Sequence, residues 1–193
     1  MALILASSST IRRQMLDAAG VEYSAIPSRV DERTIKIKLQ SDREIAGTLA
    51  KAKALDVGAA YPDGLVIGSD SVVSVDGRIF DKPRDRRQAE EHLRLFSGKT
   101  MLLTSAVAVA RSGSVEWTHV ETAKLLVRPL SDEFIRSYLD AEWPEVGYCV
   151  GVFRMEGRGV QLFDQIDGDY FTILGMPLVP LLGALRARGV LAE

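Results

Sequence analysis

Apolar and polar positions alternate along this chain in two distinct patterns. Short, nearly continuous apolar runs predict buried strands, and segments whose apolar residues recur at helical spacing predict helices. The predicted strands are residues 2–6, 21–26, 65–67, 72–75, 78–80, 101–110, 115–127, 160–166 and 170–174. The predicted helices begin near Thr10, Ser41, Asp85, Ser131 and Pro177. Strands and helices are therefore mixed, which indicates an α/β fold built on a mixed sheet.

Residues at the ends of several predicted elements support these boundaries. Ser41 with Glu44 three residues later forms a capping box, which favours a helix start. The pair Asp76-Gly77 is a strong signal for a tight hairpin. Two stretches, residues 27–32 and 147–159, are predicted to be irregular.

Composition and charge narrow the class of protein. The chain has 193 residues, of which 47% are hydrophobic and 26% charged, and this suits one globular domain over residues 1–193. The 24 basic and 26 acidic residues give a net charge of −2. Because proteins that coat nucleic acid usually carry a basic excess, we expect no nucleic-acid partner. A small anionic substrate remains compatible with this balance.

The cysteine count and the apolar runs suggest a location. Cys149 is the only cysteine, so no internal disulfide is possible, as suits a reducing compartment. The first apolar run is too short for a signal-peptide core, and no stretch approaches the length of a membrane span. We expect a cytoplasmic protein without a membrane partner.

The turn after the first predicted strand is a candidate anion site. Ser7, Ser8 and Ser9 lead into a helix whose first turn carries Arg12 and Arg13. Cations at a positively polarised helix start are unfavourable unless an anion binds there, and a phosphate would resolve the conflict. The alternative is a pair of solvated arginines on a surface helix.

Asp70 is a candidate catalytic residue or metal ligand. It lies between two apolar strand-like runs, where a carboxylate is costly unless it is paired or bound to a metal. Asp70 could therefore serve as a general base or a ligand of a divalent cation. In the alternative interpretation, it accepts hydrogen bonds from its own turn.

Weaker candidates lie elsewhere in the chain. Lys53 and Lys82 could each reach a phosphate as a point charge, although most lysines are solvated. Glu32, beside a second acid, could bind a divalent cation or be solvated. Glu156 lies in a glycine-rich segment and could contact a base edge or belong to a flexible loop. His92 falls in the apolar stripe of its predicted helix, so a serine–histidine–aspartate triad has little support.

An ordered series of short motifs runs through nearly the whole chain. They are Leu3-Ile4-Leu5-Ala6-Ser7-x-Ser9 with Arg12, Val30-Asp31-Glu32, Ala50-x-x-Lys53-Ala54, Ile67-Gly68-Ser69-Asp70, Lys82-Pro83, Ser97-Gly98-Lys99, Glu156-Gly157, and Ile166-x-Gly168-Asp169-Tyr170 through Gly175-Met176-Pro177-Leu178. As a set they resemble the Maf family of nucleoside triphosphate pyrophosphatases, often labelled septum-formation-associated proteins. The resemblance implies an inosine-triphosphatase-like α/β fold, with a mixed curved sheet, flanking helices and a cleft between two lobes.

The same resemblance implies a reaction and its residues. The reaction is hydrolysis between the α and β phosphates, helped by Mg²⁺ or Mn²⁺. Asp70 matches the family's proton acceptor. Cleft positions that hold phosphate and metal are matched by Ser7, Arg12, Glu32, Lys53 and Lys82, with Glu32 and Asp70 as metal ligands. A homodimer is also expected from the family.

The substrate base stays open between two branches of the family. Ile11 stands where the dTTP/UTP branch has an arginine, and Phe153 through Gly157 leans toward the 7-methyl-GTP enzymes. Residues 168–171 look like the general branch. The candidate substrates are dTTP, UTP or modified nucleotides such as 7-methyl-GTP, with Glu156 contacting the base. The alternative function is a nucleotide-sensing regulator of cell division that binds without turnover.

Overall fold

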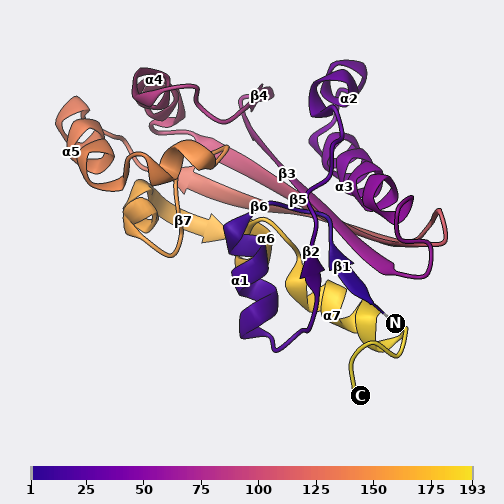
Figure 1. Cartoon of the computed structure of the whole chain (residues 1–193). Helices are drawn as coiled ribbons and strands as arrows, with labels where there is room; N and C mark the ends of the chain where they lie inside the picture. Colours follow the sequence, from indigo (N-terminus) through magenta and orange to yellow (C-terminus); the bar gives the residue numbers. More distant parts are fainter. Residues whose placement is uncertain (1, 193) are drawn as a thin grey trace. The chain divides into compact units, whose positions relative to one another are not determined.

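The computed structural model describes residues 2–192 and has an α/β fold on a seven-stranded mixed sheet (Figure 1). Its strands are β1 (Leu3–Leu5), β2 (Ser24–Ala25), β3 (Leu65–Val75), β4 (Arg78–Phe80), β5 (Thr100–Arg111), β6 (Ser114–Val127) and β7 (Phe163–Asp167). Its helices are α1 (Thr10–Ala18), α2 (Glu32–Lys38), α3 (Asp42–Gly58), α4 (Arg86–Phe96), α5 (Asp132–Glu142), α6 (Tyr170–Leu174) and α7 (Leu178–Arg186), with 3₁₀ helices at Glu145–Tyr148 and Arg158–Leu162.

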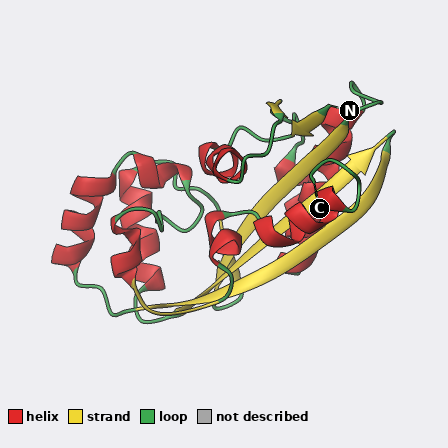
Figure 2. Ribbon diagram, turned by 90° about the horizontal axis from the view of Figure 1, so that it is seen from below, coloured by secondary structure: helices red, strands yellow, loops and turns green. Residues whose placement is uncertain are grey.

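The sheet has the strand order β2-β1-β3-β5-β6-β7, with β4 paired to β3. Strand β1 is parallel to both β2 and β3, whereas β3–β4 and β6–β7 are antiparallel. The predicted α/β class with a mixed sheet and flanking helices is therefore confirmed. The long strands are drawn yellow in Figure 2.

The chain divides into two compact units. The first unit comprises Met1–Ser71, Thr104–Thr122 and Asp169–Glu193, and the second comprises Val72–Leu103 and Ala123–Gly168.

Among residues 2–192, no helix combines the length and the apolar character needed to cross a membrane.

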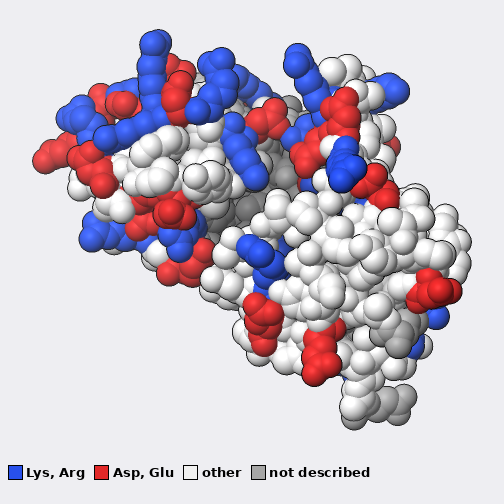
Figure 3. Space-filling model, in the orientation of Figure 1, with Lys and Arg blue, Asp and Glu red and all other residues white. Residues whose placement is uncertain are grey.

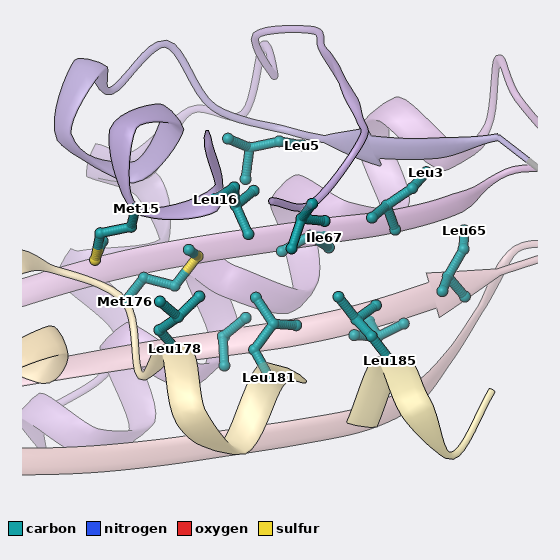
Figure 4. Packing of buried hydrophobic residues seen from close by; sticks show 13 residues of the cluster. Leu3, Leu5, Met15, Leu16, Leu65, Ile67, Met176, Leu178, Leu181 and Leu185 are labelled. Carbon is teal, nitrogen blue, oxygen red and sulfur yellow. The ribbon is translucent and has the colours of Figure 1, made fainter. Parts of the chain in front are cut away.

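One hydrophobic cluster of the first unit joins α7 and α1 to the sheet (Figure 4). Leu178, Leu181 and Leu185 recur at helical spacing, so one face of α7 points toward the strands. Leu5 and Ile67, on β1 and β3, are fully buried in the same cluster. Each such side chain contributes about 1.5–3 kcal/mol when it is fully buried. The cluster thereby anchors β3, which carries Asp70, and β1, which leads to Ser7.

A glycine on β3 lets α3 approach the sheet closely. A Cβ atom added to Gly68 would lie 2.0 Å from the Ala50 carbonyl oxygen and 2.6 Å from the Ala54 nitrogen. No side chain fits in that space, so glycine is required at this position. The close approach places the middle of α3, which carries Lys53, against the segment of β3 that leads to Asp70.

The second unit confirms three local predictions. Asp76 (φ 52°) and Gly77 (φ 75°) form the expected tight turn between β3 and β4. Asp85 and Ser131 are the N-caps of α4 and α5, and their side chains accept hydrogen bonds from backbone N–H groups. His92 is buried against the ring of Phe80, as its place in the apolar stripe predicts, and burial lowers its pKa.

Basic and acidic side chains are interspersed over α4 and α5 of the second unit (Figure 3). Arg94 pairs with Asp132 and with Glu90, and Arg86 pairs with Asp140. The basic side chains of this surface are thus matched by acidic neighbours rather than gathered into a basic patch.

Residues 170–174, predicted as a strand, instead form helix α6, so that prediction is wrong. Asp169 is the N-cap, and its carboxylate accepts a hydrogen bond of 2.9 Å from the Thr172 nitrogen. Gly175 ends the helix in the left-handed conformation, with φ 108°. Capping at both ends outweighs the strand preference of Tyr170 and Phe171.

Other boundaries also differ from the prediction. The runs at 65–67 and 72–75 form one strand, β3, which continues through Asp70. The strand predicted over 21–26 is reduced to Ser24–Ala25. The predicted loop ends in α2, because Asp31 caps a short helix that begins at Glu32. These differences place Asp70 within a strand and Glu32 at a helix start.

Candidate active site

Serine hydroxyls build the turn between β1 and α1. The Ser7 hydroxyl accepts a hydrogen bond of 3.1 Å from the Ser9 nitrogen, and the Ser9 hydroxyl accepts one of 3.5 Å from the Arg12 nitrogen. Ser9 is thus the N-cap of α1, whose first turn contains no acidic residue. The positive helix start is therefore not neutralised by the helix itself.

The Arg12 guanidinium is held by oxygen atoms of the first unit. Its Nε donates to the Gly175 carbonyl at 2.9 Å, and its Nη1 donates to the Ser69 carbonyl at 3.0 Å and the Ser7 hydroxyl at 3.4 Å. Its Nη2 donates to the Ser71 hydroxyl at 3.1 Å. Arg12 is therefore fixed in place, unlike the solvated arginine of the alternative interpretation.

The surroundings of Arg12 affect its charged form in opposite ways. Desolvation by burial lowers the pKa of Arg12, while the negative charges of Asp70 and Glu32 act to raise it. Arg12 therefore lies within electrostatic reach of both carboxylates. Arg13, one residue later, is exposed and donates only to the Thr10 hydroxyl, at 3.3 Å, among the contacts of its side chain within residues 2–192.

Lys53 joins the two predicted metal ligands. Its Nζ lies 2.6 Å from Oδ1 of Asp70 and 2.7 Å from Oε1 of Glu32. Asp70 is only 5% exposed, and Lys53 only 9%. The Asp70 carboxylate is therefore satisfied by Lys53 across the helix–strand contact and not by a turn of its own.

The arrangement of Asp70 and Glu32 fits a divalent cation completed by a substrate. Both carboxylates converge on one cation, the Lys53 ammonium, so their oxygen atoms lie close enough to share a ligand. Within residues 2–192 no group of three or more His, Cys, Asp and Glu side chains could hold a metal by itself. Mg²⁺ is often bound by one or two carboxylates together with substrate phosphates. The donor set fits this mode of binding.

Lys82 and Glu156 belong to the second unit. Lys82 is exposed after β4. Glu156 accepts a hydrogen bond of 3.2 Å from Nε of Arg154, and one third of its side chain, 33%, is exposed. Their roles toward a substrate stay predictions, as does the cleft that the resemblance implies.

The contacts of four residues around Arg12 were not predicted from the sequence, although Ser69 and Gly175 lie in the family motifs. Ser69, Ser71 and Gly175 bond to Arg12 directly, and Ser105 bonds to Ser71. The hydroxyls on both sides of Asp70 were a usable signal, since they interrupt an apolar run. Ser105 also interrupts an apolar run, that of residues 101–110, but Thr104 beside it does the same, so the pattern does not show which hydroxyl bonds to Ser71.

Comparison with known proteins identifies a family for the chain. The model of the family described as Maf-like protein matches residues 2–188 of the chain. The chain belongs to the Maf-like protein family. The predicted membership is therefore confirmed over nearly the whole length.

Relatives within the family are named as pyrophosphatases. A 7-methyl-GTP pyrophosphatase of Rhizobium etli is 47% identical over 98% of this chain and 97% of the relative. A nucleoside triphosphate pyrophosphatase of Granulibacter bethesdensis is 45% identical over 99% of each. A solved structure titled as a dITP/XTP pyrophosphatase of Mycobacterium abscessus is 16% identical, with a TM-score of 0.42 over 66% of this chain and 73% of that one.

Proposed function

We propose that this chain is a hydrolase that converts a nucleoside triphosphate into the monophosphate and pyrophosphate. Water attacks the α-phosphorus, the bond to the bridging oxygen breaks, and pyrophosphate leaves with the electron pair. Family membership and the names of the relatives support the reaction. The observation that carries the proposal is the group of Asp70, Glu32, Lys53 and Arg12, in which two acids and two cations meet in one unit.

Asp70 is the proposed general base. Its carboxylate is buried and ion-paired to Lys53 through Oδ1. A carboxylate held in a fixed position can orient the attacking water and accept its proton. Glu32, 44% exposed at its side chain, is the more open of the two acids. Lys53 offsets the repulsion between the two carboxylates and keeps them together.

Arg12, Lys53 and Lys82 are the proposed cations for the triphosphate. Positive groups in a water-poor site stabilise the charge that develops as pyrophosphate leaves. Asp70 and Glu32 would hold a Mg²⁺ or Mn²⁺ ion, which neutralises phosphate charge and polarises the phosphoryl group when it is bound. The Ser7 hydroxyl, fixed by Ser9 and Arg12, completes the proposed phosphate contacts. A homodimer and a cytoplasmic location stay predictions.

We expect metal-dependent release of pyrophosphate, because the proposed attack is at the α-phosphorus. Hydrolysis in ¹⁸O-labelled water, followed by mass spectrometry, should place the label in the nucleoside monophosphate. A parallel reaction with excess chelator should show turnover reduced by at least about a hundredfold, since the ion neutralises charge on the phosphates. A label found in pyrophosphate or release of orthophosphate would show that another bond is cleaved. Tight nucleotide binding without turnover would favour the alternative function, a nucleotide-sensing regulator of cell division.

We expect 7-methyl-GTP to be hydrolysed, because Ile11 gives an apolar wall and 7-methylguanine carries a positive charge that Glu156 can attract. In Glu156→Ala, kcat/KM for 7-methyl-GTP should fall by roughly tenfold, the scale of one hydrogen bond to a charged group. The loss for unmethylated GTP should be smaller.

Glu145→Ala is the matched control, since Glu145 is another exposed acid of the second unit, in the 3₁₀ helix Glu145–Tyr148. This variant should leave kcat/KM for 7-methyl-GTP and for unmethylated GTP within about twofold of the wild type, as is usual for surface positions. If dTTP and UTP are the best substrates and 7-methyl-GTP is not hydrolysed, the base assignment is wrong while the pyrophosphatase proposal stands.

A further inference from the structure

Two serines form a partly buried row of hydrogen bonds beside Arg12. The hydroxyl of Ser71, on β3, accepts a hydrogen bond of 3.1 Å from Nη2 of Arg12. The same oxygen lies 2.9 Å from the hydroxyl oxygen of Ser105 on β5. The Ser105 hydroxyl in turn lies 2.7 Å from the Thr172 carbonyl, in α6. Ser105 is fully buried, with 0% exposure. Nothing in the proposed reaction uses these hydroxyls.

Counting protons shows which hydroxyl donates in each hydrogen bond of this row. Each serine hydroxyl has a single hydrogen. Because a carbonyl cannot donate, the 2.7 Å contact requires Ser105 to donate to Thr172. The hydrogen between the two serines must then come from Ser71. Ser71 therefore accepts from Arg12 and donates to Ser105.

Counting protons also shows which groups donate to the Gly175 carbonyl oxygen. Its oxygen lies 2.9 Å from Nε of Arg12, 3.2 Å from the Ser69 hydroxyl and 3.1 Å from the Ser71 hydroxyl. A carbonyl oxygen has two lone pairs. With the Ser71 proton directed at Ser105, Arg12 and Ser69 fill both. Gly175 has φ 108°, which favours glycine, and a Cβ there would lie 3.2 Å from the Ser71 hydroxyl oxygen.

We propose that Ser71 and Ser105 are positioning residues that orient the Arg12 guanidinium toward the triphosphate. This inference rests on the proposed function. A guanidinium has five N–H groups, and four of those of Arg12 donate to protein oxygens. At most one, on Nη2, is left for a phosphate oxygen. Arg12 therefore binds phosphate through its charge and a single hydrogen bond, and the direction of that bond depends on Ser71.

Removing the Ser105 hydroxyl should redirect the Ser71 proton. Without its acceptor, Ser71 can donate to Gly175, where it competes with Nε of Arg12. The Thr172 carbonyl keeps a second donor, the Gly175 nitrogen at 3.1 Å, so it is not left without a hydrogen bond. The Ser105→Ala variant is therefore expected to fold and to differ mainly in the orientation of Arg12.

Thr104→Val is the matched control for this variant. Thr104 is the neighbouring residue on β5, is 1% exposed, and shares a hydrogen bond of 2.8 Å with the Thr122 hydroxyl. Within residues 2–192, its side chain makes no hydrogen bond to Arg12, Ser71 or Ser105. Ser105→Ala should lower kcat/KM for the best triphosphate by roughly tenfold, the scale of one well-placed hydrogen bond. Thr104→Val should stay within about twofold of the wild type.

A double-mutant cycle tests whether Ser105 acts through Arg12. In an Arg12→Lys background, Ser105→Ala should change kcat/KM by less than about twofold, because the two residues are coupled. An equal loss in both backgrounds would contradict the positioning role, as would equal losses in the Ser105 and Thr104 variants.

A measurement without substrate separates this inference from the proposed function. The Arg12 Nε–H signal in a ¹⁵N spectrum is identified by its absence in Arg12→Lys. Its exchange with water should be at least about fivefold faster in Ser105→Ala than in the wild type and Thr104→Val, since a weakened hydrogen bond opens more often. If the wild type hydrolyses no triphosphate, the proposed function is wrong. The exchange rate of the Arg12 Nε–H still tests whether Ser105 holds Arg12 in position. An unchanged rate in Ser105→Ala overturns the positioning role.

Discussion

Asp70→Asn should lower kcat by at least about a hundredfold, the scale of losing a general base. The substitution keeps the size of the side chain and removes the charge that accepts a proton from water. Lys53 would still contact Glu32, at 2.7 Å, so the variant does not leave its ammonium without a carboxylate. The fold should therefore survive. Steady-state kinetics on the best triphosphate measures the loss of kcat, and thermal unfolding measures whether the fold survives.

Asp76→Asn is a suitable control for this variant. Asp76 is exposed in the hairpin turn with φ 52°, a conformation that asparagine adopts readily. The same chemical change there should leave kcat within about twofold. Near-normal turnover by Asp70→Asn would remove Asp70 from the mechanism. Loss of turnover accompanied by unfolding would instead assign Asp70 a role in the fold.

Arg12→Ala should lower kcat/KM by about a hundredfold or more, the scale of removing an electrostatic contact to the transition state. The variant loses a half-buried cation and leaves Gly175, Ser69 and Ser71 without their common donor. Some loss of thermal stability should accompany it, because buried acceptors lose hydrogen bonds. Kinetics on a folded preparation, below the unfolding transition, isolates the effect on activity.

Arg13→Ala is the matched control, with the same substitution one residue later. Helix geometry turns Arg13 about 100° away from Arg12. Its side chain is exposed and bonds within its own helix turn, to Thr10. We expect kcat/KM to change by less than about threefold, as at other surface positions. Equal losses in the two variants would show that the family motif is aligned in the wrong register.

Local chemistry made several elements predictable from the sequence. Asp76-Gly77 supplies the positive φ angles that a tight hairpin needs, and Ser41 with Glu44 caps a helix whatever surrounds it. The family motifs identified Arg12, Lys53 and Asp70 as candidates without any coordinates. These signals act within a few residues, so the sequence alone is sufficient to show them.

Contacts between distant segments decided the rest. The helix at 170–174 contains strand-forming residues; besides its local cap at Asp169, it is held by a long-range hydrogen bond from the Thr172 hydroxyl to Glu121 on β6. The row of hydrogen bonds beside Arg12 joins β3, β5 and α6, and the sequence does not show which of the adjacent hydroxyls, Thr104 or Ser105, belongs to it.

The meeting of Asp70 with Glu32 on one ammonium is likewise a tertiary result. It depends on α3 lying against Gly68, where no side chain fits. The sequence by itself determined which residues carry charge and where turns and caps occur, because those preferences are local. Which charges are paired, and which hydroxyls orient Arg12, was decided only by tertiary structure, because packing brings together groups that the chain holds far apart.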